Sequence, residues 1–241
     1  MFIMILGKMI IFMLGGKIMY DDKIEEELIK FISFTGMIQP FLLNLREMAH
    51  HWGLYSDEFN VVELGVDIGA STVAFLSGLN SSARGFESLG KGKKAKHHLY
   101  SCDILDHCDR KYFVDDTYMD RWSFFAVDSV SFADMIPDVI PNIVFIDTDH
   151  TYDTTVKELE VWSERLIEGG RILLHDTLLE GVHIPIKEFL EKNGDWGFYD
   201  IGVSCGLGVL TKPGGYDPNS NFEPYESETE RFIIRPRRTI N

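Results

Sequence analysis

Basic residues and cysteines are scarce in this chain, and each shortage argues against a class of protein. Its 241 residues include 23 Lys and Arg against 38 Asp and Glu, which gives a formal net charge of −15 at pH 7. Because nucleic-acid binding needs clustered Lys and Arg, we expect no nucleic-acid partner, and an anionic membrane surface is disfavoured as well. The three cysteines, Cys102, Cys108 and Cys205, include no C-x-x-C pair. A disulfide framework is therefore not expected, and we predict reduced cysteines in a cytoplasmic protein.

Long apolar runs are also rare, and the one at the N-terminus is interrupted. Residues 1–19 are almost entirely apolar but contain Lys17 and the pair Gly15–Gly16. The run falls short of the roughly 20 apolar residues that a transmembrane helix needs. No small-residue cleavage site of a secretory signal precedes Tyr20. Three interpretations stay open: true initiation at Met19, a segment that packs on a partner, or a weak membrane anchor.

The remaining sequence alternates between strand-like and helix-like segments, without internal repeats or low-complexity stretches. The expected helices are Asp21–Phe31, one that opens at Gln39–Pro40, Ser71–Leu79, Thr154–Leu166 and Val182–Lys192. The expected strands are Asn60–Leu64, Leu99–Ile104, Phe124–Ser129, Asn142–Asp147, Arg171–Leu174, Phe198–Val203 and Gly206–Thr211. This alternation predicts an α/β fold with a doubly wound, mostly parallel sheet. The last two strands have almost no connector and should pair antiparallel.

Between the expected strands and helices, Ser81–His98 is rich in Gly and Lys and is expected to form an exposed loop. The predicted organisation is an apolar leader (1–19), an N-terminal helical segment (20–59), a ligand-binding domain (60–213) and a polar tail (214–241).

The stretch from Val61 to Thr72 carries the most specific pattern: a buried strand, a turn with two glycines and a helix start that Ser71 or Thr72 can cap. Its glycines, Gly65 and Gly69, do not follow the dinucleotide spacing G-x-G-x-x-G. Glu63 stands just before them, and an acid there suits a ligand with an ammonium group rather than a phosphate. S-adenosylmethionine (SAM) is such a ligand. NAD, or a structural turn without a ligand, remain the alternatives.

Acidic residues recur at or near the carboxyl ends of five successive expected strands: Glu63, Asp103, Asp128, Asp147 and Asp176. Ligands of open α/β sheets bind beyond these ends, where an acid after the second strand can accept hydrogen bonds from a ribose. Asp147 and Asp176, with His150 or His175, could hold a divalent cation such as Mg²⁺, Mn²⁺ or Fe²⁺. Alternatively, one of the two histidines acts as a metal-free general base, or both only hydrogen-bond loops.

Three runs of sequence, Ile146–Asp153, Lys157–Trp162 and Glu168–Thr177, resemble the class I SAM-dependent methyltransferases of the methyltransferase 24 type. These are relatives of the catechol and macrocin O-methyltransferases and of cephalosporin hydroxylase-like proteins. The Glu63–Thr72 stretch is similar to their cofactor motif, and the resemblance covers about residues 37–213. It implies a Rossmann-like, seven-stranded sheet with an antiparallel last strand, helices on both faces, and SAM as cofactor.

The resemblance also implies roles for single residues. Glu63 would face the methionine amino group, directly or through water, Asp103 would bind the ribose, and Asp128 with Ser129 the adenine edge. The cofactor residues implied are Glu63, Gly65, Gly69, Ser71, Asp103, Asp128 and Ser129. The candidate metal ligands are Asp147, Asp176 and His175, and the candidate catalytic residues are Asp147, His150 and His175. This chain has Thr177 where catechol-type enzymes have Asn, and His175 where hydroxylase-like relatives carry Glu.

The resulting prediction is an O-methyltransferase that acts on a hydroxyl of a small molecule, a sugar or a phenolic metabolite, with or without a metal. A SAM-binding partner protein without activity and an NAD-dependent oxidoreductase are the alternatives. A homo-oligomer is compatible with the sequence, which fixes no subunit number.

Overall fold

The chain divides into two units, Met1–Ile38 and Gln39–Asn241. The computed structural model describes residues 3–6, 9–12, 40–88, 94–108, 110, 119–203 and 205–214. In the first unit, β1 (Ile3–Leu6) pairs antiparallel with β2 (Met9–Phe12). The helix expected over Asp21–Phe31 and nearly all of the expected polar tail lie outside the described residues.

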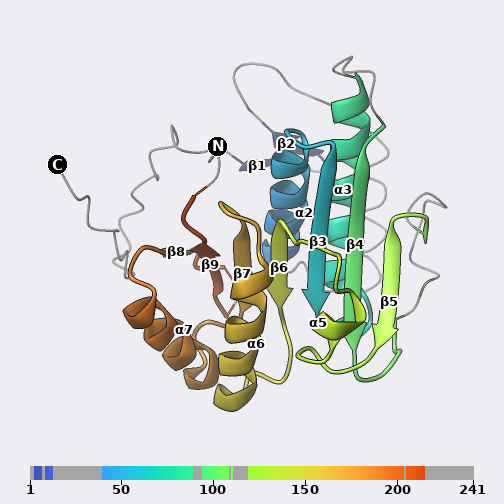
Figure 1. Ribbon diagram of the computed structural model, residues 1–241. Coiled ribbons are helices and arrows are strands. Elements are labelled where there is room, and N and C mark those ends of the chain that lie inside the picture. The colour runs from blue at the N-terminus through green and yellow to red at the C-terminus, as the bar shows by residue number, and fades with distance from the viewer. Residues whose placement is uncertain are drawn as a thin grey trace. The chain divides into compact units, whose positions relative to one another are not determined.

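The second unit contains a seven-stranded sheet with the order β5-β4-β3-β6-β7-β9-β8 (Figure 1). Its strands are β3 (Glu58–Leu64), β4 (Lys96–Asp103), β5 (Trp122–Ala126), β6 (Ile143–Ile146), β7 (Arg171–His175), β8 (Gly197–Asp200) and β9 (Leu207–Thr211). The pairs among β3, β4, β5, β6 and β7 are parallel, whereas β9 runs antiparallel to both β7 and β8. The expected Rossmann-like sheet with an antiparallel last strand is confirmed.

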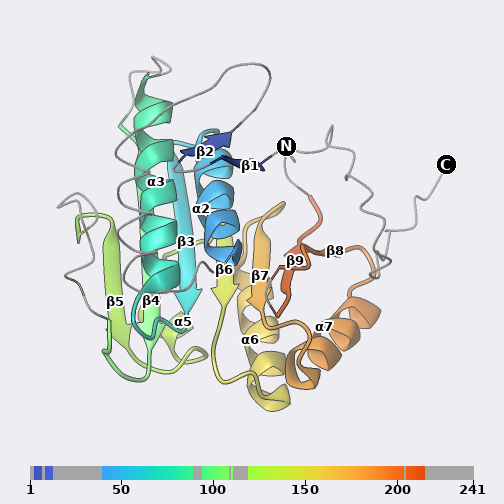
Figure 2. The same ribbon diagram turned by 180° about the vertical axis from the view of Figure 1, so that it is seen from behind.

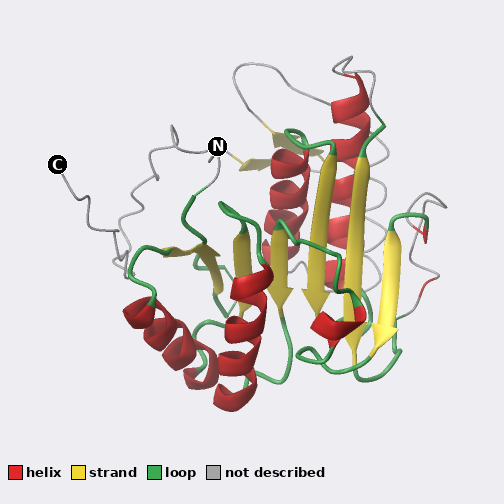
Figure 3. Cartoon of the chain, viewed as in Figure 1, coloured by secondary structure: helices red, strands yellow, loops and turns green. Residues whose placement is uncertain are grey.

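Helices cover both faces of this sheet, as expected (Figures 1 and 2). One face carries α2 (Pro40–Gly53) and α3 (Ala70–Ser88), which pack on each other, and the other carries α5 (Phe132–Met135), α6 (Tyr152–Arg165) and α7 (Glu180–Lys192). Figure 3 shows the alternation of strands and helices that produces these layers. The chain leaves β3 toward β4 and later returns to β6 on the opposite side of β3. Ligands of doubly wound sheets bind beside such a reversal of strand order.

The central strands are buried on both faces, which explains their continuous apolar sequences. All four residues of β6 are at most 4% exposed, and Ile172, Leu173 and Leu174 of β7 are fully buried. Trp162, on the inward face of α6, is also fully buried in the same core. Each such side chain contributes about 1.5–3 kcal/mol of hydrophobic stabilisation, so this core holds the carboxyl ends of β3, β6 and β7 in fixed register.

The prediction of an exposed loop over Ser81–His98 was wrong for most of that segment. Helix α3 continues to Ser88, and β4 already begins at Lys96. Ala83 and Phe86 are buried at helical spacing, so packing extends the helix through a stretch whose Ser and Gly residues favour a loop. None of the helices in the described part of the chain combines the length and apolarity that a membrane crossing requires.

Candidate functional site

The turn after β3 lies where the strand order of the sheet reverses. Gly65 (φ +90°) and Gly69 (φ +95°) adopt left-handed conformations that favour glycine. A Cβ atom on Gly65 would overlap the carbonyl oxygen of Asp147, so the space left by the missing side chain is filled by backbone that follows β6. The Gly65 amide donates to the Cys102 carbonyl of β4 at 2.9 Å. Gly65 therefore lets three neighbouring strand ends meet.

Glu63 lies beneath this turn and is fully buried. Its carboxylate accepts hydrogen bonds from the hydroxyls of Ser71 (2.6 Å), Thr72 (2.8 Å) and Ser101 (2.6 Å). Burial raises the pKa of Glu63 to about 7, although the three hydroxyls counteract that rise. The predicted cofactor residues Glu63 and Ser71 are thus hydrogen-bonded to each other. Through these hydrogen bonds the Glu63 carboxylate fixes the start of α3 to β3 and β4.

Asp103, the last residue of β4, reaches the same turn from the side. Its Oδ2 atom accepts the backbone N–H groups of Val66 (2.9 Å) and Asp67 (3.0 Å). Partial burial alone would raise the pKa of Asp103, but the N–H groups of Asp67 and Val66 outweigh it and hold that pKa below its usual range. Asp103 therefore orders the glycine turn. It also lies at the position predicted to accept hydrogen bonds from a ribose.

Asp128 and Ser129 follow β5 on the outer side of the sheet. Asp128 is exposed, and its Oδ1 accepts the backbone N–H groups of Val130 (3.2 Å) and Ser131 (2.9 Å) ahead of α5. These N–H groups, that of Ser131 above all, lower the pKa of Asp128. The carbonyl of Ser129 accepts the indole N–H of Trp162 at 3.0 Å.

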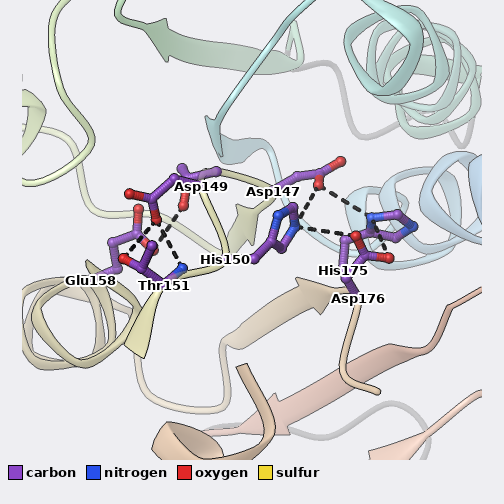
Figure 4. A network of polar contacts seen from close by, with 8 residues as sticks. Asp147, Asp149, His150, Thr151, Glu158, His175 and Asp176 are labelled. Atoms are coloured by element: carbon purple, nitrogen blue, oxygen red, sulfur yellow. Dashed lines mark hydrogen bonds and ion pairs between the residues drawn. The ribbon is translucent and has the colours of Figure 1, made fainter. Parts of the chain in front are cut away.

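Asp147, His150, His175 and Asp176 form a polar cluster at the ends of β6 and β7 (Figure 4). His150 Nε2 and His175 Nδ1 both lie 3.2 Å from Asp147 Oδ1. Asp176 completes the group, with Oδ2 at 3.5 Å from His150 Nε2 and Oδ1 at 3.4 Å from His175 Nδ1. The structure therefore brings together all the residues predicted as catalytic or metal-binding.

The electrostatics of the cluster couple its members. Burial alone would raise the pKa of Asp147, but His150 and His175 outweigh it and lower that pKa. The hydrogen bond to Asp147 raises the pKa of His150. Burial alone would lower the pKa of His175, but Asp147 and Asp176 outweigh it and raise that pKa. The cluster is an arrangement of two acids that favours a cation between them.

Backbone strain marks the same edge of the sheet. In the described part of the chain, the non-glycine residues with positive φ are Asp67 (+47°), His150 (+57°) and Asp176 (+56°), and each lies just beyond a strand end. A residue held in this region costs on the order of 1–3 kcal/mol and is typical of ligand sites. The cluster is also accessible, since the side chains of Asp147 and His150 are 26% and 22% exposed.

The donor set fits a divalent cation. Ligand atoms of Asp147, His150 and His175 lie within 4.8 Å of one another, and Asp176 Oδ1 is buried without a hydrogen-bond partner among the described residues. A donor set of two imidazoles and carboxylates suits Mn²⁺ or Fe²⁺, whereas Mg²⁺ prefers ligands that are all oxygen atoms. The hydroxyl of Thr177, the residue after Asp176, donates a hydrogen bond to Asp200.

Two contributions to the site were not predicted from the sequence. Phe41, near the start of α2, packs its ring on His175 with centroids 4.3 Å apart. His175 Nε2 is buried without a hydrogen-bond partner among the described residues, so ring packing orients this imidazole in place of the usual second hydrogen bond. Glu158 of α6 is fully buried below the loop after β6. The apolar spacing of both helices indicated buried faces, but nothing local indicated these partners.

Residues 62–177 match the model of a family described as a methyltransferase domain. Among solved structures, a methyltransferase from Geobacter sulfurreducens is 14% identical with a TM-score of 0.56, over 80% of this chain and 90% of that chain. An O-methyltransferase from Bacillus cereus, solved in complex with S-adenosylhomocysteine (SAH), is 14% identical with a TM-score of 0.54, over 80% and 91% of the two chains. At this identity the two structures show a shared fold. No curated protein matches the sequence.

Proposed function

Because residues 62–177 of this chain belong to the methyltransferase-domain family, we propose that the protein transfers the methyl group of SAM to a hydroxyl oxygen of a small molecule. The observation that carries the hydroxyl acceptor is the accessible cluster of Asp147, His150, His175 and Asp176 next to the glycine turn. A transfer to oxygen needs a group that removes or stabilises the hydroxyl proton, and this cluster supplies both acids and imidazoles.

The cofactor would lie over the turn after β3, with its ribose at Asp103 and its adenine beside Asp128 and Ser129. Glu63 then acts mainly as a positioning residue, because its carboxylate is bonded to Ser71, Thr72 and Ser101. Gly69 would let the methionine part approach the backbone, whereas Gly65 makes room for the Asp147 carbonyl. In this arrangement the cofactor would lie over β5, β4 and β3, and the acceptor over β6 and β7.

In the reaction, the acceptor oxygen forms a bond to the methyl carbon as the bond from that carbon to sulfur breaks, and SAH leaves. The hydroxyl proton passes to an imidazole. His150 is the better proton acceptor, because its side chain is more exposed than that of His175, which lies under Phe41. Most of the acceleration comes from holding the two reactants in line.

A divalent cation at the cluster would be held by Asp147, Asp176 and His175, with His150 as a fourth donor. When bound, such a cation lowers the pKa of a coordinated hydroxyl and orients it. The metal-free alternative uses His150 alone as the base. Both versions need Asp147, which lies within 3.2 Å of both imidazoles.

Binding of the cofactor can be tested with thermal unfolding. Millimolar SAM or SAH is expected to raise the melting temperature of the wild-type protein, and Asp103→Ala is expected to remove that rise, because it removes the ribose acceptor and releases the turn. Asp106→Ala is the matched control: Asp106 is an exposed acid in the loop that follows β4, and it pairs with Arg110. An unchanged melting temperature of the wild-type protein at millimolar SAM would count against the proposal.

Turnover separates an enzyme from a SAM-binding partner protein. SAH release is expected with some members of a panel of sugars and phenols, and not with Asp147→Asn. The same panel with Mg²⁺, Mn²⁺ or chelator then distinguishes the metal-assisted route from the metal-free route. Binding of SAM without SAH release on any hydroxyl would favour the non-catalytic alternative.

A further inference from the structure

Glu158 is a charged residue in a position where an apolar side chain would be expected. It lies on the inward face of α6 and is fully buried. Its Oε2 atom accepts a hydrogen bond from the Thr148 hydroxyl at 3.2 Å, whereas its Oε1 atom is buried without a partner among the described residues. Burial raises the pKa of Glu158 to about 7, although the hydrogen bond from Thr148 counteracts that rise. A buried acid of this kind costs stability.

Helix α6 is hydrogen-bonded to both halves of the proposed site, through Glu158 to Thr148 and through Trp162 to Ser129. Thr148 lies directly after Asp147, in the loop that carries the acceptor side. Ser129 belongs to the loop after β5, on the adenine side, and its carbonyl accepts the indole N–H of Trp162 at 3.0 Å. Glu158 and Trp162 are one turn apart on α6. One rigid helix therefore contacts both loops through polar groups.

We propose that Glu158 is a positioning residue that holds the loop after β6 against α6, the helix whose Trp162 holds the loop after β5, and so sets the distance between bound cofactor and the Asp147 cluster. The inference rests on the proposed function. In-line methyl transfer is sensitive to displacements of about 1 Å between its reactants, and supporting hydrogen bonds commonly provide that accuracy. The hydrogen bond to Thr148 is what the carboxyl contributes and a leucine of similar size would lack.

The test measures the dissociation constants of SAH and of Mn²⁺ by calorimetry, with the melting temperature recorded in parallel. Glu158→Leu is expected to weaken binding of both ligands by about 10-fold or more, the size found for residues that support metal ligands. Thr148→Val removes the same hydrogen bond from the other side and is expected to act in the same direction. Glu158→Gln keeps an acceptor for Thr148 and is expected to stay within about 2-fold of wild type.

Glu160→Gln is the matched control, because Glu160 is an exposed acid on the same helix. A purely structural role predicts a lower melting temperature for Glu158→Leu with unchanged dissociation constants, and that result, or weakening of only one ligand, would overturn the inference. If Glu158→Leu does not fold, Thr148→Val decides by the same criterion. A wild-type protein that does not bind SAH counts against the proposed function, and the inference falls with it. A wild-type protein that binds SAH but not Mn²⁺ favours the metal-free route, and the SAH dissociation constants alone then decide the inference. Failure confined to the variants counts against the inference alone.

Discussion

Gly65 lies against the backbone of Asp147, which belongs to the other half of the site. A methyl group at this position would collide with the Asp147 carbonyl and would also force a left-handed conformation on a residue with a Cβ atom. We expect Gly65→Ala to lower the free energy of unfolding by about 2–6 kcal/mol, the sum expected for a strained backbone and an overpacked contact. Urea denaturation measures this loss.

Gly194 provides the control for that substitution. It is exposed, and a Cβ atom built on it meets nothing within 4 Å. Gly194→Ala should therefore change the free energy of unfolding by less than about 1 kcal/mol. Equal losses in the two variants would contradict the claim that the contact with Asp147 makes Gly65 necessary.

The raised pKa of Glu158 predicts the direction in which the free energy of unfolding changes with pH. Its pKa is raised from 4.5 to about 7 in the folded protein, so between these values the folded state binds more protons than the unfolded state. Stability from this group is present at low pH and is lost as the pH rises through that window. Relative to wild type, the free energy of unfolding of Glu158→Gln should therefore increase by about 1.4 kcal/mol per pH unit across it.

Denaturation of both proteins at pH 5, 6 and 7 measures this difference, and taking the difference removes contributions from other groups. His50 is one of them, since burial lowers its pKa to about 4 and gives the opposite slope below pH 6.5. Parallel stability profiles for wild type and Glu158→Gln would show that the carboxyl of Glu158 does not titrate in this range.

Single residues also show what sequence reasoning can reach. The acids at the strand ends were found because their position follows from strand boundaries. The partners of Glu63 were not, because Ser101 lies 38 residues away and its hydroxyl is matched to Glu63 only by strand register. Glu158 was missed because its position on α6 reads as the solvated part of a charged helix. Whether the predicted cofactor residues bind SAM stays a prediction.

At the scale of elements, α2 supports the site although it lies outside the matched family segment. Phe41 is 3% exposed and packs on His175. Phe41→Ala should lower the free energy of unfolding by about 3–5 kcal/mol. It should also weaken Mn²⁺ binding by about 10-fold, since it frees the imidazole that the metal needs in one orientation.

Leu42 separates these two effects. It is the next residue of α2 and is 6% exposed. Leu42→Ala should cost about 2–5 kcal/mol by the same cavity mechanism. Because Leu42 is not stacked on the imidazole, its truncation should leave the dissociation constant of Mn²⁺ unchanged. Equal weakening in the two variants would show that general loosening, rather than the ring contact, controls the metal affinity.

Helix α3 shows why elements were easier to predict than their ends. Its start followed from the turn chemistry at Gly69, but its end at Ser88 depends on the burial of Ala83 and Phe86. Tertiary packing decides such boundaries over local propensity. The mostly parallel, seven-stranded sheet with an antiparallel last strand, in contrast, followed from the alternation of elements and from the family resemblance, and it is confirmed.

At the scale of the whole molecule, the strand order explains why five acids serve different purposes. Glu63 of β3, Asp103 of β4 and Asp128 after β5 lie on one side of the reversal, and Asp147 after β6 and Asp176 after β7 lie on the other. Hydrogen bonds from the glycine turn, from hydroxyls and from imidazoles offset the negative charge of these groups separately. The acidic edge is therefore compatible with a stable fold and leaves the β6–β7 side free for a cationic or hydroxyl-bearing ligand.

The net charge of the chain makes a last prediction about the acceptor. The chain has a formal net charge of −15 over 241 residues, so the electrostatic field of the protein repels phosphates. Sequence-independent RNA binding, which typically has dissociation constants of about 10⁻⁴–10⁻⁶ M, depends on the release of counterions by clustered Lys and Arg. We therefore expect no change in the fluorescence anisotropy of a labelled 20-nucleotide RNA at micromolar protein, even at 50 mM salt and with SAH present. A micromolar dissociation constant that weakens steeply as salt is added would instead point to a nucleic-acid acceptor. Absence of binding in the same titration would leave the small hydroxyl compounds of the turnover panel as the acceptor class that the charge and the Asp147 cluster jointly favour.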